Sequence, residues 1–458
     1  MSESSREFSS FRDPSGAVFQ RDGVLYRQIN ECYRAQYEAL MKNGLYDALV
    51  KNGTLISHAE VPQAPMTAEG FCVIRPERVP MISYPYEWSF SMLQDAALTT
   101  LRAHRAALDR GMILKDASAY NIQFLRGQAV LIDTLSFDFA VEGKPWIAYG
   151  QFCRHFLAPL ALMAYTDIRL NQLLKNWIDG IPIDLAAKLL GKQGGLFCKQ
   201  HIVWHARAVQ KHDEDGKRTA PAKELKLPLS AQIAMIESMM RGIERMALPK
   251  QQTEWGAYYS STNYSETAAN AKQTLVREYL AQAKPESVWD IGANDGRFSR
   301  LALELGAHVV ALDIDPLAVE SGYRWVRREK QTLLPLVCDL TNPSPAIGFA
   351  NRERGTLFSR QKPDCILALA LIHHLAISNN LPLAMIAGWL SERTQSLVIE
   401  FVPKTDSQVQ VLLATRDDIF PDYTEEGFEA AFSTYFEIAR KDRVADSERT
   451  MYLLRSKH

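Results

Sequence analysis

Two hydrophobic patterns alternate along the second half of the chain. Short apolar runs typical of buried strands are VWDIG, HVVALDID, LLPLVCDL, DCILALAL and SLVIEFV. Between several of them lie segments whose apolar residues recur every three or four positions, as on one face of a helix. This alternation predicts a parallel sheet with helices on both faces.

The pattern changes near the end of the chain. The runs TYFEIARKDRV and RTMYLLR are joined by the short polar turn ADSE, which predicts an antiparallel hairpin at one edge of the sheet. We therefore expect an α/β fold whose C-terminal part is a Rossmann-like, seven-stranded sheet with a terminal antiparallel hairpin.

The first half of the chain has a different order of elements. GAVFQRDGVLYRQI predicts a β-hairpin that turns at residues 21–23. A helix, the strands GTLISHAEV and FCVIRPERVPMISYPYEW, and the long helix SMLQDAALTTLRAHRAALDRG follow. This order predicts an N-terminal α+β domain over residues 1–206.

A polar segment separates the two halves. RAVQKHDEDGKRTAPAKELK is rich in charge and poor in apolar residues, and the helical pattern LSAQIAMIESMMRGIERM follows it. We place a linker and connecting helix at residues 207–250 and a second domain at residues 251–458.

Composition excludes several classes of protein. The net charge is −1, from 52 basic and 53 acidic residues, which argues against a nucleic-acid partner. The six cysteines include no C-x-x-C pair, so neither a zinc site nor a disulfide framework is expected. The polar N-terminus is unlike a signal peptide, and the apolar run FLAPLALMAY is too short to span a bilayer. We expect a cytoplasmic protein without a membrane partner.

The loop after the first predicted strand of the second domain has the composition of a cofactor loop. In DIGANDG, Gly292 and Gly296 allow sharp turns and a close approach of the backbone to a ligand. Asn294 tolerates a positive φ better than most residues. The spacing is G-x-x-x-G, whereas a dinucleotide site would need G-x-G-x-x-G. Asp290 and Asp295 would also repel a pyrophosphate, but they suit a cofactor that carries positive charge.

Acidic residues end the next two strands. A carboxylate at Asp313 would accept hydrogen bonds from ribose hydroxyls, whereas Asp315 would cap the following helix. Asp339 and Leu340 end the third strand, within reach of an adenine. The predicted cofactor-binding residues are Asp290, Gly292, Ala293, Asn294, Gly296, Asp313, Ile314, Asp339 and Leu340.

These motifs resemble those of a known enzyme family. PESVWDIGANDGRFSRLALELGAHVVALDIDPLAV resembles the class I S-adenosylmethionine (SAM) dependent methyltransferases, and DCILALALIHHL at residues 364–375 is similar to that family's fourth motif. The resemblance covers about the last 200 residues. It implies a methyltransferase with SAM as its cofactor.

Three residues are candidates for chemistry. His373 and His374 follow the fourth strand, where a histidine could act as a base toward a hydroxyl acceptor. Glu400 ends the fifth strand and could orient an acceptor. The alternative for each is a role in packing. The aromatic residues Trp255, Tyr258, Tyr259 and Tyr264 could form a lid over the pocket or belong to the core.

The first domain carries a second resemblance. Asp116, Asn121 and Asp133 match in type, order and spacing the catalytic segment of the protein-kinase and aminoglycoside-phosphotransferase fold. The resemblance implies Mg-ATP, with Asp116 near the acceptor and the other two on the metal. However, no glycine-rich loop precedes Arg27, which stands nearest to the place of the family's lysine. The alternative is that these side chains hold turns.

Segments spread over the whole chain, including ISYPYEWSF, LKDASAYNIQF and QFCRHFLAPLALMA, are similar to bacterial host-specificity nodulation proteins. This similarity suggests methyl transfer to a saccharide or cell-surface signal molecule, with the acceptor itself unknown. Two alternatives remain open. One is a bifunctional kinase-like and methyltransferase enzyme, and the other is a non-catalytic SAM-binding scaffold.

Overall fold

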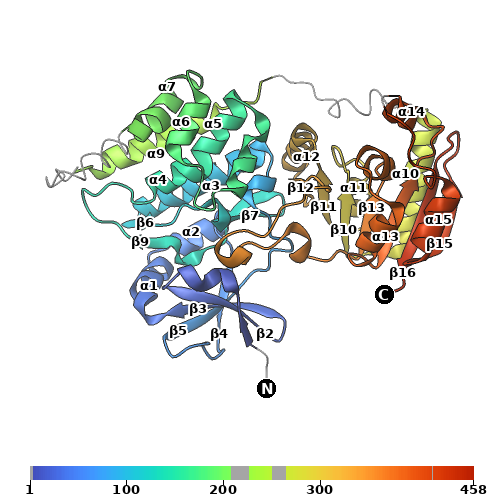
Figure 1. Ribbon diagram of the computed structural model, residues 1–458. Helices are drawn as coiled ribbons and strands as arrows, with labels where there is room; N and C mark the ends of the chain where they lie inside the picture. Colours follow the sequence, from blue (N-terminus) through green and yellow to red (C-terminus); the bar gives the residue numbers. More distant parts are fainter. Residues whose placement is uncertain (1–3, 208–225, 250–264, 415) are drawn as a thin grey trace. The chain divides into compact units, whose positions relative to one another are not determined.

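The computed structural model describes residues 4–207, 226–249, 265–414 and 416–458 (Figure 1). The chain forms two compact units. The first contains residues 1–251 together with residues 345–355, and the second contains residues 252–344 and 356–458. The 345–355 segment thus lies in the sequence of the second unit but belongs to the first, which the hydrophobic pattern had not indicated.

An antiparallel five-stranded sheet begins the first unit, in the order β1-β2-β3-β5-β4. Its strands are β1 (Ser4–Arg6), β2 (Gly16–Arg21), β3 (Val24–Asn30), β4 (His58–Val61) and β5 (Gly70–Pro76). The predicted hairpin at residues 21–23 is confirmed, with positive φ at Asp22 and Gly23. The strand expected to continue to residue 88 is wrong beyond Pro76. Prolines recur in that stretch, and they donate no backbone hydrogen bond to a sheet.

Helices make up most of the rest of the first unit (Figure 1). They are α1 (Arg34–Lys42), α2 (Leu45–Lys51), α3 (Phe90–Leu108), α4 (Tyr149–Phe152), α5 (Ala158–Tyr165), α6 (Ile183–Leu190), α7 (Gly195–Cys198) and α9 (Leu229–Glu244). Two small ribbons pair β6 (Met112–Leu114) with β9 (Phe137–Phe139), and β7 (Ile122–Leu125) with β8 (Gln128–Leu131). The expected connecting helix is α9, which packs on α3. The Gln94 amide on α3 donates to the carbonyls of Ile243 and Met246.

The second unit is built on a seven-stranded sheet in the order β12-β11-β10-β13-β14-β16-β15. The strands are β10 (Ser287–Ile291), β11 (His308–Asp313), β12 (Leu334–Val337), β13 (Cys365–Ala368), β14 (Ser396–Phe401), β15 (Phe436–Arg443) and β16 (Thr450–Ser456). Neighbours from β12 to β14 pair in parallel, and β16 pairs antiparallel with both β14 and β15. The α/β architecture expected for this part of the chain is therefore confirmed.

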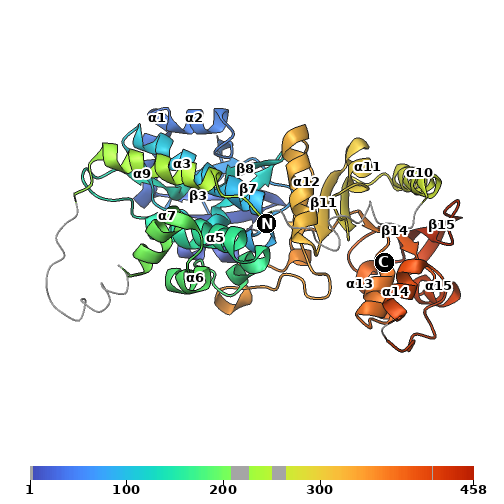
Figure 2. The same ribbon diagram turned by 90° about the horizontal axis from the view of Figure 1, so that it is seen from above.

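Helices cover both faces of this sheet (Figure 2). On one face lie α10 (Glu266–Ala283), α11 (Ser299–Glu304) and α12 (Pro316–Glu329), and on the other lie α13 (Leu383–Ser391), α14 (Ser407–Leu413) and α15 (Glu425–Ser433). The chain runs outward from β10 through β11 to β12, and then returns to the other side of β10 as β13. Ligands of open α/β sheets bind at such a reversal, beyond the carboxyl ends of the strands.

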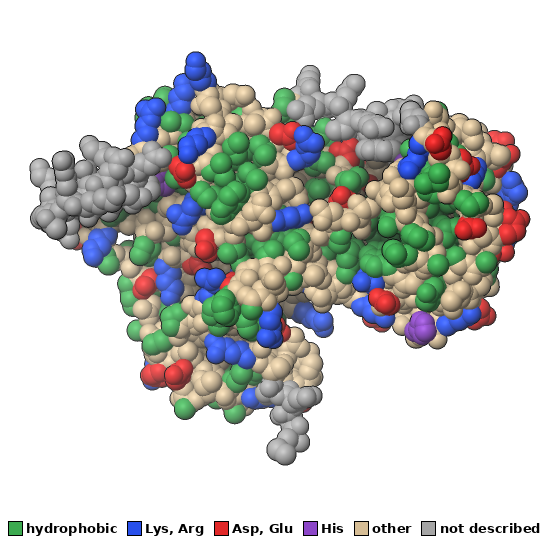
Figure 3. All heavy atoms as spheres, in the orientation of Figure 1, with side chains coloured by type: hydrophobic (Ala, Val, Ile, Leu, Met, Phe, Trp, Pro, Cys, Tyr) green, Lys and Arg blue, Asp and Glu red, His purple; other side chains and the backbone are tan. Residues whose placement is uncertain are grey.

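The surface is mixed in charge. Basic and acidic side chains both occur on each unit in the face drawn in Figure 3. Among the described helices, none combines the length and the apolar composition that a membrane span requires.

Candidate cofactor site

A cavity of about 410 Å³ lies in the second unit at the carboxyl ends of β10, β11, β12 and β13. This is the size of a small-molecule pocket. All nine predicted cofactor-binding residues except Gly296 line it. The lining also includes Lys272, Ala370, Leu371 and His374.

The loop after β10 forms one wall of the cavity. Its φ angles are positive at Gly292 (77°), Asn294 (52°) and Gly296 (83°). The backbone N–H groups of Gly292 and Ala293 both donate to the Leu312 carbonyl of β11. A Cβ at position 292 would lie 3.1 Å from the Leu371 side chain. Glycine at this position therefore keeps the loop close to the residues that follow β13.

Asp313 ties this loop to the end of β11. Its Oδ2 accepts a hydrogen bond from the Asn294 N–H at 2.7 Å, and its Oδ1 accepts one from the Asp315 N–H at 2.8 Å. Burial raises the pKa of Asp313 to about 6 even though these bonds oppose the shift. Asp315 caps α12 by accepting from the Leu317 N–H, as the sequence suggested.

A second acid lies deeper in the cavity wall. Asp290 is almost completely buried, and the Ser299 hydroxyl donates to its Oδ2 at 2.6 Å. Burial raises the pKa of Asp290 to about 7, and the nearby Asp313 carboxylate adds to the rise. Positive charge in the cavity would stabilise the ionised forms of both acids.

The residues that follow β11 and β12 give the cavity both an apolar and an acidic lining. Ile314 exposes 57% of its surface, which is unusual for a residue next to a buried strand. Asp339 accepts hydrogen bonds from the N–H and the hydroxyl of Thr341, both at Oδ1. Leu340 lies between them in the lining. An aromatic ring with a polar edge would suit these surroundings.

The two adjacent histidines have rings in contact, with centroids 4.1 Å apart, but they differ in their access to the cavity. Among the described residues that line the cavity, His374 is present and His373 is not. His374 begins a π-helical turn, His374–Ser378, and burial lowers its pKa to about 4. His373 is 2% exposed, and burial lowers its pKa well below the usual value. The imidazole that can reach a ligand is therefore that of His374.

Glu400 has contacts unlike those expected of a residue that orients an acceptor. Its carboxylate is fully buried, accepts from the Lys272 ammonium at 2.6 Å and from the Ala370 N–H at 2.7 Å, and lies 3.5 Å from Arg449. It is absent from the described cavity lining, whereas Lys272 and Ala370 belong to it. Glu400 therefore does not line the cavity but bonds to two residues that do.

Lys272, the partner of Glu400, was not among the residues predicted from the sequence. The sequence does indicate that Glu400 has a buried partner, because an acid within the apolar run SLVIEFV needs one. That indication does not say which cation is the partner.

Other predicted residues lie elsewhere. The first unit contains Asp116, Asn121 and Asp133, so these residues are not part of the cavity. The aromatic residues Trp255, Tyr258, Tyr259 and Tyr264 fall outside the described residues, so the predicted lid stays a prediction.

One curated relative matches almost the whole chain. The nodulation protein NoeA of Rhizobium meliloti (strain 1021) is 34% identical over 455 residues, which covers 98% of this chain and 95% of that protein. The chain belongs to the NoeA family of nodulation proteins. No protein-family model matches it.

Solved structures give more distant matches. The N-methyltransferase NodS from Bradyrhizobium japonicum WM9 is 10% identical, with a TM-score of 0.32, over 42% of this chain and 99% of NodS. Magnesium protoporphyrin IX methyltransferase (ChlM) from Synechocystis PCC 6803, with bound SAH, is 19% identical. Its TM-score is 0.31, over 43% of this chain and 91% of ChlM. These scores are too low to bear on the function of the NoeA-family chain.

Proposed function

We propose that the second unit of this NoeA-family protein is a class I SAM-dependent methyltransferase. The observation that carries the proposal is the cavity at the carboxyl ends of the strands, which gathers Asp290, Asp313 and Asp339 around a loop with positive φ angles. Asp313 would receive the ribose hydroxyls. Ile314 and Leu340 would pack on the adenine, and Asp339 would accept from its amino group.

The charge of the cavity supports SAM over a phosphate-bearing cofactor. The lining contains three carboxylates and two cations, Lys272 and Arg297, and Lys272 is already paired with Glu400. The excess of acidic groups disfavours a pyrophosphate. SAM instead brings a sulfonium and an ammonium, both positive. Binding a cation beside Asp290 and Asp313 would relieve the cost of ionising these buried acids, because opposite charge lowers a raised carboxyl pKa.

His374 is the group best placed to act on an acceptor. With a pKa of about 4 it is neutral at physiological pH, so it can accept a proton from a hydroxyl as that hydroxyl attacks the methyl carbon. Much of the rate of methyl transfer would come from alignment of the two reactants within the cavity. We propose an acceptor among saccharides or cell-surface signal molecules, in keeping with the nodulation role in the name NoeA.

Calorimetric titration with SAM tests the proposal. Asp313→Asn should weaken SAM binding by about 10- to 100-fold, because one charged hydrogen bond is worth about 1.5–3 kcal/mol. Asp364→Asn is the matched control. Its carboxylate also accepts from backbone N–H groups, those of Glu286 and Ser287, but at the opposite end of the same sheet. The control should bind SAM within about twofold of wild type, since distant sites act independently.

The outcomes separate the parts of the proposal. If the wild-type protein does not bind SAM, the proposed function fails. If both variants bind as wild type does, the ribose assignment to Asp313 fails. The alternative of a non-catalytic SAM-binding scaffold is tested by S-adenosylhomocysteine formation with a saccharide pool. A scaffold would bind SAM and form no product.

A further inference from the structure

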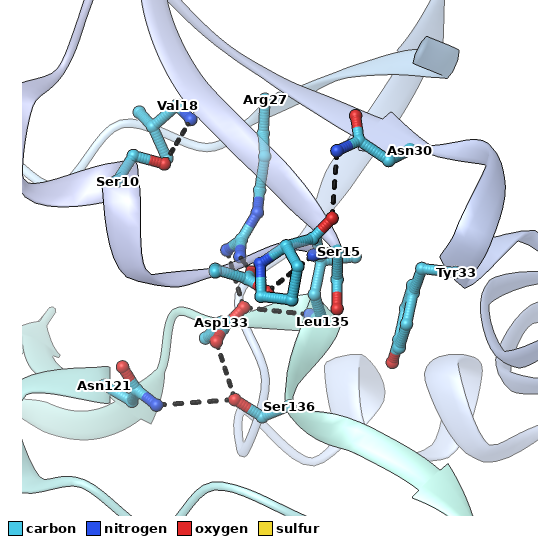
Figure 4. Close-up of polar contacts among 12 residues, drawn as sticks. Ser10, Ser15, Val18, Arg27, Asn30, Tyr33, Asn121, Asp133, Leu135 and Ser136 are labelled. Atoms are coloured by element: carbon cyan, nitrogen blue, oxygen red, sulfur yellow. Dashed lines mark hydrogen bonds and ion pairs between the residues drawn. The ribbon is translucent and has the colours of Figure 1, made fainter. Parts of the chain in front are cut away.

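An ion triplet lies in the first unit at the place where the kinase-like resemblance would require a metal. Arg27 on β3 donates from Nη1 to Asp133 at 2.6 Å (Figure 4). It also donates from Nη2 to Asp13 at 2.9 Å. The Arg27 and Asp133 side chains are only 13% and 15% exposed. One guanidinium therefore forms ion pairs with two carboxylates that come from different parts of the chain.

The remaining groups of the cluster are bonded to one another. Asp133 accepts from the Leu135 N–H at 2.9 Å and from the Ser136 hydroxyl at 2.7 Å. The Asn121 amide donates to the same Ser136 oxygen at 3.4 Å (Figure 4). Asp116 accepts from the Ser118 N–H and from the Gln151 amide. The side chains that would ligate a metal are thus engaged with neighbouring residues of the protein.

A short segment fixes Asp13 beside Arg27. The Asn30 N–H donates to the Ser15 carbonyl, and the Asn30 amide donates to the Pro14 carbonyl. The Lys115 ammonium donates to the Ser15 hydroxyl at 3.2 Å. At Gly16 a Cβ would lie 2.2 Å from the Gln28 carbonyl oxygen, so this segment and β3 are in close contact. The second carboxylate is therefore held in place by the backbone.

A working phosphotransferase of the kinase type needs a different arrangement. Its strand cation pairs with a helix glutamate, and its second aspartate stays available to Mg²⁺. Here Glu38 on α1 is bonded to Arg34 and Lys42, and Arg27 is bonded to Asp133 instead. The residues present do not fit Mg-ATP.

We infer that Arg27 occupies the place of the divalent cation, so that an internal ion pairs with Asp13 and Asp133 and the first unit does not bind Mg-ATP. The unit is then a metal-independent scaffold, and the bifunctional alternative fails for this chain. This inference does not depend on the proposed methyltransferase function.

Binding of Mn²⁺ and of Mn-ATP to the full-length protein tests the inference, with Mn²⁺ relaxivity as the readout. Wild type should bind neither probe more tightly than Asp133→Asn does. Arg27→Met should gain saturable Mn²⁺ binding, because Asp13 and Asp133 lose their shared cation. The double variant Arg27→Met/Asp133→Asn should lose that gain. Arg126→Met is the control, since it removes an ion pair with Glu77 in the same unit and should gain nothing.

Two results would overturn the inference. One is saturable Mn-ATP binding by wild type that disappears in Asp133→Asn. The other is a folded Arg27→Met protein, with an unchanged thermal melt, that binds no Mn²⁺. If Arg27→Met does not fold, Arg27→Gln replaces it, because its amide can still donate to one of the two acids. If neither variant folds, the comparison of wild type with Asp133→Asn decides the question.

Discussion

The Lys272 ammonium of α10 lies 2.6 Å from the Glu400 carboxylate of β14, with 5% and 0% of the two side chains exposed. Glu400 also accepts from the Ala370 N–H, where the backbone has a φ of 51°. Burial lowers the pKa of Lys272, and the neighbouring Glu400 partly opposes that shift. Glu400 thus holds two residues of the cavity lining, Lys272 and Ala370, in place through hydrogen bonds.

Lys272→Met should lower the free energy of unfolding by about 3–5 kcal/mol, because it leaves a buried carboxylate without its nearest cation. Arg449 stays close to Glu400, so the lower end of this range is expected. Urea denaturation measures the change. Lys404→Met is the control, since its pair with Asp418 is more exposed and should contribute no more than about 1 kcal/mol. Equal losses in the two variants would contradict a structural role for the buried pair.

The neighbouring histidines should differ in their effect on catalysis. His374→Ala should lower kcat by about 10²- to 10⁴-fold if the imidazole accepts the acceptor's proton. KM for SAM should change little, because the group acts on the other substrate. His373→Leu removes a buried ring whose Nδ1 has no hydrogen-bond partner among the described residues, and kcat should stay near that of wild type. Steady-state kinetics of S-adenosylhomocysteine formation would distinguish the two residues, and equal losses would contradict the assignment.

The sequence alone predicted the features of the fold and of the site that depend on residues close together in the chain. The loop DIGANDG lies between a buried strand and a helix, and its two glycines and Asn294 have the positive φ angles that such a loop needs. The cap at Asp315 and the hairpin turn at residues 21–23 are also local, and both are present. Each of these features depends on residues close together in the chain, so one sequence suffices to infer it.

Features that depend on distant partners could not be inferred in the same way. Lys272 and Glu400 are 128 residues apart, and a helical pattern does not mark a lysine as buried. Arg27 could be recognised as a substitute for a lysine, but its bonds to Asp13 and Asp133 depend on how β3 packs against another ribbon. The 345–355 segment carries no pattern of its own, and only packing assigns it to the first unit.

SAM affinity should rise with pH between about 5.5 and 7.5. The pKa values of Asp313 and Asp290 are raised to about 6 and about 7, so these groups are largely protonated at the start of this range. A cationic cofactor favours their ionised forms, and binding therefore releases protons. Each proton released steepens the dependence by about tenfold per pH unit below the pKa. Calorimetry in buffers of different protonation enthalpy measures the release, and Asp313→Asn should reduce it.

The free energy of unfolding of the SAM-free protein should fall as the pH rises, because of Asp290 and Asp313. Their folded-state pKa values lie above the ordinary value of 3.8, so the folded protein binds more protons than the unfolded chain between about pH 4 and 7. Their contribution to stability is therefore complete below about pH 4 and is lost as the pH rises through 6 and 7. Urea denaturation of the SAM-free protein across this pH range measures the loss, and a stability that does not fall would contradict it. SAM binding that is independent of pH, with no proton release, would contradict the expected rise in affinity.

The 345–355 segment should stabilise the first unit through Glu353. This carboxylate is 2% exposed and accepts from Arg12 at Nε (3.0 Å) and Nη2 (2.8 Å), and from the Phe349 N–H. Burial opposes ionisation of Glu353, but the bonds from Arg12 and Phe349 prevail and its pKa is lowered. Phe349 stacks on Phe8 with ring centroids 6.5 Å apart. The segment therefore has both a polar and an aromatic anchor.

Arg12→Ala should lower the free energy of unfolding of the first unit by about 1–3 kcal/mol, because it leaves a buried carboxylate without its cation and with only the Phe349 N–H as a donor. Thermal unfolding followed by near-UV circular dichroism measures the loss. Arg34→Ala is the control, since the pairs of Arg34 with Glu31 and Glu38 are local and open to solvent, so that they should contribute about 0.5 kcal/mol or less. Arg12→Ala/Glu353→Leu should recover part of the loss, because no buried charge remains. If Arg12→Ala is as stable as the control, Glu353 does not anchor the segment.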